Sequence, residues 1–196
     1  MASPPDKFEH NIAKYMADSM AAIEAMKGQT ATISMIAKKL NETRADDSTI
    51  YIMGNGGSAS TASHMANDLN KTSAKNGKKR FKAISLADNM PLFSAWANDN
   101  SYDVVFEEQL RNFLAAKDVV IGISGSGNSP NIIKGIEYAN KTGAFTIGIT
   151  GNISEGGKLA KTANLSIAVP DNLMYRIEDL HLMLNHILAY AFLHED

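Results

Sequence analysis

The first quarter of the chain carries apolar residues at steps of three and four, which is the spacing of one face of a helix. This pattern runs from about Asp6 to Arg44 and is interrupted at Gly28. Two helices, or one helix kinked at Gly28, fit the pattern equally well. The stripe is rich in Met and Ala, and it suits packing within the chain or against a second chain. Its members are Phe8, Ile12, Tyr15, Met16, Ile23, Met26, Ile33, Ile36 and Leu40.

After this segment, short apolar runs alternate with stretches of helical spacing. Strands that alternate with helices indicate a parallel sheet covered by helices on both faces. We therefore predict an α/β protein with an N-terminal helical extension. The expected strands are Thr49–Met53, Phe81–Leu86, Asp118–Ser124, Ala144–Thr150 and Leu165–Val169. The expected helices are Ser58–Asn70, Pro91–Trp96, Val104–Leu114, Pro130–Thr142, Glu155–Lys161 and Leu173–Leu193, with a turn at Asn98–Ser101.

Composition narrows the class of protein. The 196 residues suggest one structural unit, and the net charge of −2 argues against nucleic-acid binding. The absence of cysteine excludes disulfides, thiolate catalysis and cysteine-ligated metal sites. The start of the chain is polar, and no apolar run approaches the ~18 residues of a membrane span. We expect a cytoplasmic protein that binds neither membranes nor nucleic acid.

A glycine-rich turn, Gly54-Asn-Gly-Gly-Ser58, follows the first predicted strand and precedes a helix. Glycine permits close approach of the backbone to a ligand. A helix N-terminus supplies unpaired N–H groups and a partial positive charge. In parallel sheets, ligands bind outside the carboxyl ends of the strands. The turn is therefore a candidate anion site, although a purely structural turn is equally consistent with it.

A second turn, Ser124-Gly-Ser-Gly-Asn-Ser129, stands in the same context before another helix. Its hydroxyls and backbone N–H groups can together satisfy the oxygens of a phosphate. Neither turn contains the lysine of a nucleoside-triphosphate loop or the pattern of a dinucleotide-binding turn. Two such turns in one chain favour a monophosphate ligand.

Acidic and histidine residues lie on two of the expected helices. His64 and Asp68 are four residues apart and share a helix face, where they can bind a divalent metal or simply pair with each other. On the last helix, Glu178 and His181 are three residues apart, a spacing that also suits a metal. The alternative for His181 is a half-buried histidine with no role in chemistry.

These segments, together with Leu159–Pro170 and Arg176–His181, resemble the sugar isomerase (SIS) domain family over nearly the whole chain. The likeness is closest to its sedoheptulose-7-phosphate isomerase (phosphoheptose isomerase) branch. It implies a flavodoxin-like three-layer sandwich with a five-stranded parallel sheet. It also implies a homotetramer whose active sites are lined by neighbouring subunits. We then expect residues 1–45 to be helices that pack in the oligomer and residues 46–196 to be the phosphosugar-binding domain.

The resemblance implies a reaction and a set of site residues. The reaction would convert sedoheptulose 7-phosphate to D-glycero-D-manno-heptose 7-phosphate through an enediol, with Asp68 as base and His186 as acid, or the reverse. One Zn²⁺ per subunit would be bound by His64, Asp68, Glu178 and His186. The implied substrate contacts are Asn55, Gly56, Gly57, Ser58, Asp68, Asn98, Asp99, Ser124, Gly125, Ser126, Ser129 and Glu178.

The implied metal set contains a geometric conflict. Glu178 and His186 lie about 12 Å apart along a straight helix. They can share a metal only if a neighbouring subunit supplies one of them or if the helix is irregular between them.

This chain also departs from the family pattern at three positions. Asp68 stands where the family has Glu, Glu178 where it has Gln, and Tyr175 where an Asp commonly precedes Arg176. A displacement of about 1 Å at a catalytic base can lower a rate about a hundredfold. The alternatives to this isomerase are therefore an isomerase for a different phosphosugar and a non-catalytic SIS protein that acts as a sugar-phosphate sensor or a protein-binding scaffold.

Overall fold

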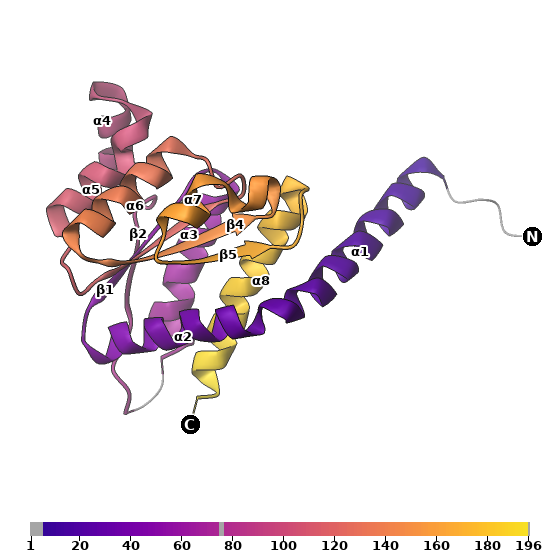
Figure 1. Ribbon diagram of the computed structural model, residues 1–196, viewed down its shortest axis with the longest axis horizontal. Helices are drawn as coiled ribbons and strands as arrows, with labels where there is room; N and C mark the ends of the chain where they lie inside the picture. The colour runs from indigo at the N-terminus through magenta and orange to yellow at the C-terminus, as the bar shows by residue number, and fades with distance from the viewer. Residues whose placement is uncertain (1–5, 75–76, 196) are drawn as a thin grey trace, which may run out of the picture.

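The computed structural model describes residues 6–74 and 77–195, and its centre is one five-stranded parallel sheet (Figure 1). The strand order is β2-β1-β3-β4-β5. All five predicted strands are confirmed, with ends shifted by at most one residue. The central strands are buried along almost their whole length, as a sheet covered on both faces requires. The strands are β1 (Thr49–Gly54), β2 (Lys82–Ser85), β3 (Val119–Ser124), β4 (Phe145–Gly151) and β5 (Leu165–Val169).

Helices cover the sheet on both sides and give the predicted three layers. Side chains from α2, α3 and α8 build the core on one face, and those from α5, α6 and α7 build the core on the other. The helices are α1 (Lys7–Met26), α2 (Thr30–Ala45), α3 (Gly57–Asn67), α4 (Met90–Asp99), α5 (Val105–Phe113), α6 (Pro130–Thr142), α7 (Gly157–Thr162) and α8 (Met174–Leu193). Short 3₁₀ or π segments are η1 (Lys27–Gln29), η2 (Asp68–Thr72), η3 (Tyr102–Val104) and η4 (Ile153–Gly156). No helix in the described ranges is long and apolar enough to cross a lipid bilayer.

Two expectations about element ends are corrected by the structure. The turn expected at Asn98–Ser101 starts later, because Asn98 and Asp99 are the last residues of α4. The helix expected to run to Asn70 changes at Asp68 from α to π geometry. A π segment within a helix frequently marks a functional site.

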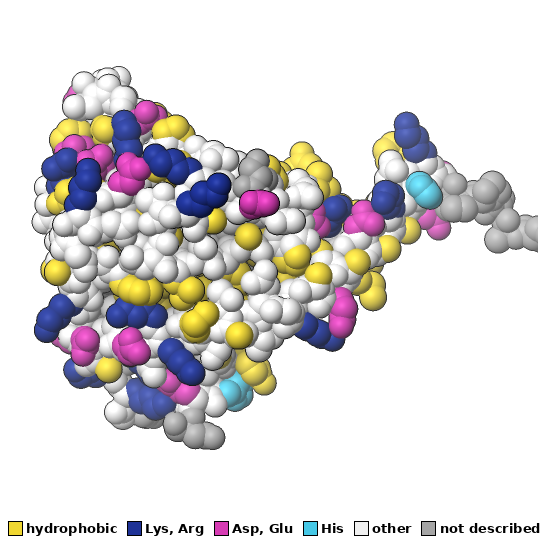
Figure 2. All heavy atoms as spheres, in the orientation of Figure 1, with side chains coloured by type: hydrophobic (Ala, Val, Ile, Leu, Met, Phe, Trp, Pro, Cys, Tyr) yellow, Lys and Arg dark blue, Asp and Glu magenta, His cyan; other side chains and the backbone are white. Residues whose placement is uncertain are grey.

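The N-terminal pattern gives two helices rather than one kinked helix, because η1 separates α1 from α2 at Gly28. Helix α1 projects from the body of the molecule (Figure 1). Only Ala22 and Met26 of this helix are buried. Figure 2 shows apolar side chains exposed along α1. We define the α1 stripe as the exposed residues Phe8, Ile12, Met16, Met20 and Ile23.

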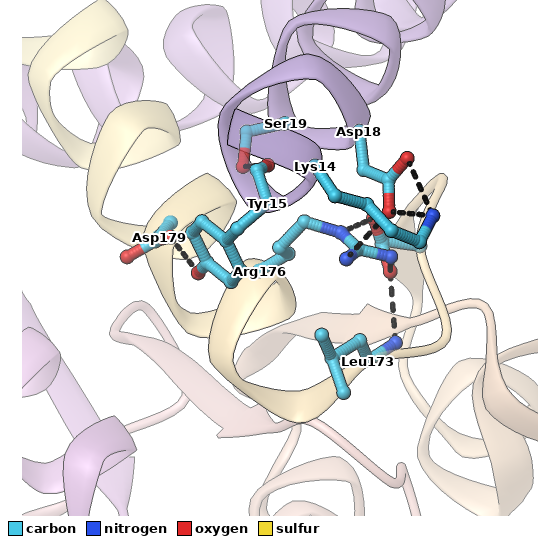
Figure 3. A network of polar contacts seen from close by, with 8 residues as sticks. Lys14, Tyr15, Asp18, Ser19, Leu173, Arg176 and Asp179 are labelled. Carbon is cyan, nitrogen blue, oxygen red and sulfur yellow. Dashed lines mark hydrogen bonds and ion pairs between the residues drawn. The ribbon is translucent and has the colours of Figure 1, made fainter. Parts of the chain in front are cut away.

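Polar contacts attach α1 to the beginning of α8 (Figure 3). The Tyr15 hydroxyl donates to Asp179 at 2.5 Å, and this hydrogen bond raises the pKa of Tyr15 to about 12. Arg176 donates to the carboxylate of Asp171 at 2.6 and 3.1 Å and lies 3.4 Å from Asp18. Burial raises the pKa of Asp171, but the hydrogen bonds from Arg176 and from the Leu173 N–H outweigh it and lower the pKa overall. The network thus fixes the direction in which α8 leaves β5.

The side chain of His181, on α8, points into the core, and the residue is 1% exposed. The expectation of a half-buried histidine is therefore wrong. Within the described part of the chain, neither ring nitrogen has a hydrogen-bond partner of normal geometry. Burial lowers the pKa of His181 to about 4, and a weaker interaction with the Thr150 backbone opposes this only in part. The ring is therefore neutral at physiological pH and acts as core packing.

We predict that acid destabilises the fold through His181. Between pH 6.5 and about 4 the unfolded chain binds a proton that the folded chain does not, so stability falls as the pH falls. The full effect is about 3 kcal/mol. Urea denaturation of wild type and His181→Leu across this range measures it. The variant should lose less stability than wild type on acidification, and parallel pH profiles for the two proteins would contradict the prediction.

Candidate active site

The two predicted anion turns lie side by side at the carboxyl edge of the sheet. Strands β1 and β3 are neighbours, with Gly54 paired to Ile123. The turns that follow them are joined by a reciprocal amide pair. Asn55 Nδ2 donates to Asn131 Oδ1 at 2.9 Å, and Asn131 Nδ2 donates to Asn55 Oδ1 at 2.8 Å. The structure therefore brings together the two turns that the sequence identified.

The second turn presents hydroxyls before the N-terminus of α6. The hydroxyls of Ser124 and Ser129 are 3.0 Å apart, and Ser126 Oγ accepts from the Asn128 N–H at 3.2 Å. Ser129 is the N-cap residue of α6, but its side chain makes no capping hydrogen bond. At the start of α6, Pro130 has no N–H, and the Ile132 and Ile133 N–H groups donate to Asn131 Oδ1 and to the Ser129 carbonyl oxygen. Among these described groups the Asn131 N–H stays available to an anion. Gly127 has φ +66°, and a Cβ there would lie 1.8 Å from the Gly156 carbonyl oxygen, so the turn requires glycine.

The first turn is different, because a carboxylate already lies against it. A Cβ at Gly57 would lie 2.5 Å from both carboxylate oxygens of Glu178, so this side chain covers the start of α3. The partial positive charge of the helix N-terminus favours that carboxylate and leaves less attraction for a second anion. Ser58 is buried in the same turn. The geometry therefore favours the second turn over the first as the binding site for a phosphate.

Two turns farther along α3 and α8, an acid–base cluster faces solvent. His64 Nε2 lies 3.3 Å from His186 Nε2, and Asp68 Oδ2 lies 3.4 Å from His64 Nε2 and 3.8 Å from His186 Nε2. The Asp68 side chain is 8% exposed, whereas those of His64 and His186 are 43% and 54% exposed. The carboxylate is thus held inside the protein while both imidazoles remain accessible.

Neighbouring polar groups fix the orientation of the Asp68 carboxylate. Asn185 Nδ2 donates to Oδ2 at 2.8 Å, and Asn67 Nδ2 and Thr72 Oγ1 lie within 3.2 and 3.3 Å of Oδ1. Asn185 is itself buried. Asn185 was not predicted as a site residue, and its position directly before His186 is the only sequence signal that points to it.

The cluster of His64, Asp68 and His186 could hold a metal ion. A tetrahedral ion bound at about 2.0–2.1 Å keeps its ligand atoms about 3.3 Å apart, close to the shorter distances observed here. Glu178 does not join these three residues within the chain. Helix α8 is regular from Met174 to Leu193, so an irregular helix cannot bring Glu178 and His186 together. This leaves a second subunit as the remaining way to obtain the four-residue set.

A cavity of about 280 Å³ opens beside the first turn. The expected substrate residues Asn98 and Asp99 do not line it; they are exposed at the end of α4, and Asn98 donates to Asp99. Tyr102, which the sequence analysis missed, does line it and donates to Asn55 Oδ1 at 2.9 Å. The lining is Gly54, Asn55, Gly56, Ala59, Ala87, Met90, Phe93 and Tyr102.

Comparison with known proteins agrees with this geometry. Residues 14–151 match the family model of the SIS domain. The chain is 34% identical to a phosphoheptose isomerase from Trichlorobacter lovleyi, over 91% of this chain and 90% of the relative. It is 38% identical to one from Leptospira biflexa, over 80% of each. The solved phosphoheptose isomerase from Neisseria gonorrhoeae has a TM-score of 0.87 and 29% identity, over 95% of this chain and 98% of that one.

We predict that replacing His64 by alanine weakens divalent-metal binding by at least tenfold, because one of three clustered ligand atoms is lost. A titration with Co²⁺, monitored through the visible absorption of the bound ion, measures the affinity of the protein for the metal. His10→Ala is the matched control, since His10 is exposed on α1 and far from the cluster in sequence. Equal Co²⁺ affinity of His64→Ala and wild type would contradict the assignment.

Proposed function

Because the chain belongs to the phosphoheptose isomerase family of SIS-domain proteins, it is an aldose–ketose isomerase, and we propose that it converts sedoheptulose 7-phosphate to D-glycero-D-manno-heptose 7-phosphate. The observation that carries this proposal is the arrangement along α3 and α8. Two serine- and glycine-rich turns lie at one end of this helix pair, and an acid–base cluster lies farther along it. A phosphate and a carbonyl group of one substrate can therefore be bound at separate places.

The phosphate is assigned to the second turn. Ser124, Ser126 and Ser129 supply hydroxyls, and the backbone N–H groups of Gly125 and Asn131 supply further donors. Ser58, Gly56 and Gly57 of the first turn then face the sugar rather than the phosphate, since Glu178 covers the start of α3. In this position Glu178 can accept hydrogen bonds from sugar hydroxyls.

The spacing of the site supports a long sugar. Gly57 and His64 are seven residues apart on α3, or about 10 Å at the rise of an α-helix. A sugar chain that contacts both the first turn and the cluster must therefore extend over several carbons.

Asp68 and His186 are the proposed acid–base pair. One removes the proton from the carbon next to the carbonyl group, and the other donates a proton to the neighbouring carbon or oxygen of the enediol. Asn185 holds Asp68 Oδ2 toward both imidazoles, so the carboxylate needs no reorientation during the reaction. Although the Asp68 side chain is one methylene shorter than that of Glu, its Oδ2 lies 3.4 Å from His64 Nε2 and 3.8 Å from His186 Nε2.

We propose Zn²⁺, one per subunit, as the metal of this cluster, with His64, Asp68 and His186 as ligands from one chain. A bound Zn²⁺ would polarise the substrate carbonyl and stabilise negative charge on its oxygen. Glu178 could complete the four-residue set only from a second copy of the chain. Metal binding and proton transfer both need Asp68, so its two carboxylate oxygens would divide these tasks.

The α1 stripe supports the proposed homotetramer. Phe8 and Met20 are 80% and 72% exposed, and exposed apolar surface of this kind marks interaction sites. We propose that residues 1–45 pack between subunits, that residues 46–196 form the phosphosugar-binding domain, and that neighbouring subunits help to line each active site. Asn98 and Asp99 would reach substrate only in such an assembly or after α4 moves. A cytoplasmic location stays a prediction.

We predict that the enzyme with Zn²⁺ converts sedoheptulose 7-phosphate to an aldose, and that Asp68→Asn and His186→Ala each lower turnover by about 10²–10⁴-fold. Chromatographic separation of ketose and aldose products measures the conversion. Asp46→Asn is the charge-matched control, because this exposed residue lies at the opposite edge of the sheet. No turnover by wild type, or full turnover by the combined double variant, would reject the proposed function.

We also predict that Ile12→Glu combined with Met16→Glu dissociates the oligomer, because the charges enter its apolar contact. Light scattering coupled to size-exclusion chromatography measures the mass. Ala21→Glu places a charge on the opposite side of α1 and should leave the mass unchanged. A monomeric wild type, or a double variant with the mass of wild type, would contradict the proposed role of α1.

A further inference from the structure

Tyr102 and two asparagines form a hydrogen-bonded group between the two turns. Asn55 lies in the first turn, Asn131 in the first turn of α6, and Tyr102 at the start of η3. The Tyr102 hydroxyl and Asn131 Nδ2 both donate to Asn55 Oδ1, at 2.9 and 2.8 Å. Asn55 Nδ2 donates to Asn131 Oδ1 at 2.9 Å.

A backbone group fixes which way both amides point. The Ile132 N–H lies 3.0 Å from Asn131 Oδ1, and an N–H can only donate, so the oxygen of Asn131 must face it. That same oxygen accepts from Asn55 Nδ2, which leaves Asn131 Nδ2 to donate to Asn55 Oδ1. Asn131 is 1% exposed, so water cannot replace the partners of its amide group.

The hydrogen-bond capacity of Asn55 then follows from counting. Its Oδ1 has two lone pairs, and both are used by Tyr102 and Asn131. Its Nδ2 has two hydrogens, and one is used by Asn131. Asn55 therefore retains one N–H donor and no acceptor for a ligand.

This remaining donor belongs to a residue that lines the cavity beside the first turn. Tyr102 lines the same cavity. Its ring packs edge-on against Phe93, with ring centroids 5.7 Å apart and an interplanar angle of 80°. That packing does not involve the hydroxyl, so the ring can stay in place when the hydroxyl is removed.

We propose that Tyr102 is a positioning residue that, with Asn131, fixes Asn55 as a donor only, directed at an acceptor oxygen of the bound sugar phosphate. The inference rests on the proposed function for the identity of the ligand. It restricts the implied substrate contact of Asn55 to donation, because its amide oxygen can no longer accept a hydrogen bond from a sugar hydroxyl. Without the Tyr102 hydroxyl, Asn55 Oδ1 regains a free lone pair and can accept a hydrogen bond from solvent or substrate.

Calorimetric binding of sedoheptulose 7-phosphate and of inorganic phosphate, combined with steady-state turnover, tests this role in the full-length enzyme. For Tyr102→Phe we expect Kd and KM for the sugar phosphate to rise roughly fivefold, as for the loss of one neutral hydrogen bond. The kcat and the melting temperature should stay at wild-type values. Tyr138→Phe is the matched control, because Tyr138 lies on another part of α6, where its ring packs against Arg111 of α5.

Asn55→Asp provides a second test, because an oxygen at this position can still accept from Tyr102. The variant lacks both N–H groups of Asn55, the one that donates to Asn131 and the one left for a ligand. We expect this variant to bind the sugar phosphate at least tenfold more weakly than Tyr102→Phe does. Unchanged Kd in Tyr102→Phe, or a fall in its melting temperature with kcat and KM changing together, would overturn the proposal.

The same data separate this inference from the proposed function. A wild type that binds the sugar phosphate without isomerising it rejects the proposed reaction, and the variants' Kd values still decide the role of Tyr102. A wild type that binds neither probe rejects both.

Discussion

The parallel packing of α3 against α8 is the constraint on which the site depends. Both helices start at the carboxyl edge of the sheet and run in the same direction on one face. The start of α3 at Gly57 therefore meets Glu178 near the start of α8, and His64 meets His186 about two turns later. The buried hydrogen bond from Asn185 to Asp68 joins the helices at the same level. Any change in the register of this pair would separate the acid–base groups.

The groups suited to binding the phosphate lie apart from the groups suited to proton transfer. The serine hydroxyls that follow β3 suit a phosphate, and the cluster farther along α3 suits proton transfer and metal binding. Two features then shape selectivity. The carboxylate of Glu178 covers the start of α3 and disfavours a second anion there, and the amide pair of Asn55 and Asn131 holds the two turns at a fixed distance. The enzyme can thus select a ligand that has one anionic end and a polyhydroxylated chain.

The strands, the two turns and part of the acid–base cluster could be predicted from the sequence, because their signals are local. Apolar runs ended by glycine or turn residues gave the strands, and the two glycine- and serine-rich turns followed directly from strand ends. The spacing of His64 and Asp68 was enough to place them on one helix face. The family resemblance added His186, which no local pattern connects with α3.

The features that the sequence did not reveal all depend on contacts between distant segments. Asn185 and Tyr102 have no distinguishing local pattern, and each matters through one hydrogen bond to a residue far away in the chain. The full burial of His181 depends on how deeply α8 packs on the sheet. The family resemblance implied that Glu178 is a metal ligand, whereas within this chain the regular helix α8 places its carboxylate against Gly57 at the start of α3.

The most direct test of this account is a crystal structure of the enzyme with Zn²⁺ and sedoheptulose 7-phosphate, in which anomalous scattering locates the metal. The account predicts a zinc peak between His64, Asp68 and His186, a phosphate at Ser124–Ser129, and one sugar chain connecting them. A metal bound elsewhere, or a phosphate seated on α3 with Glu178 displaced, would contradict it.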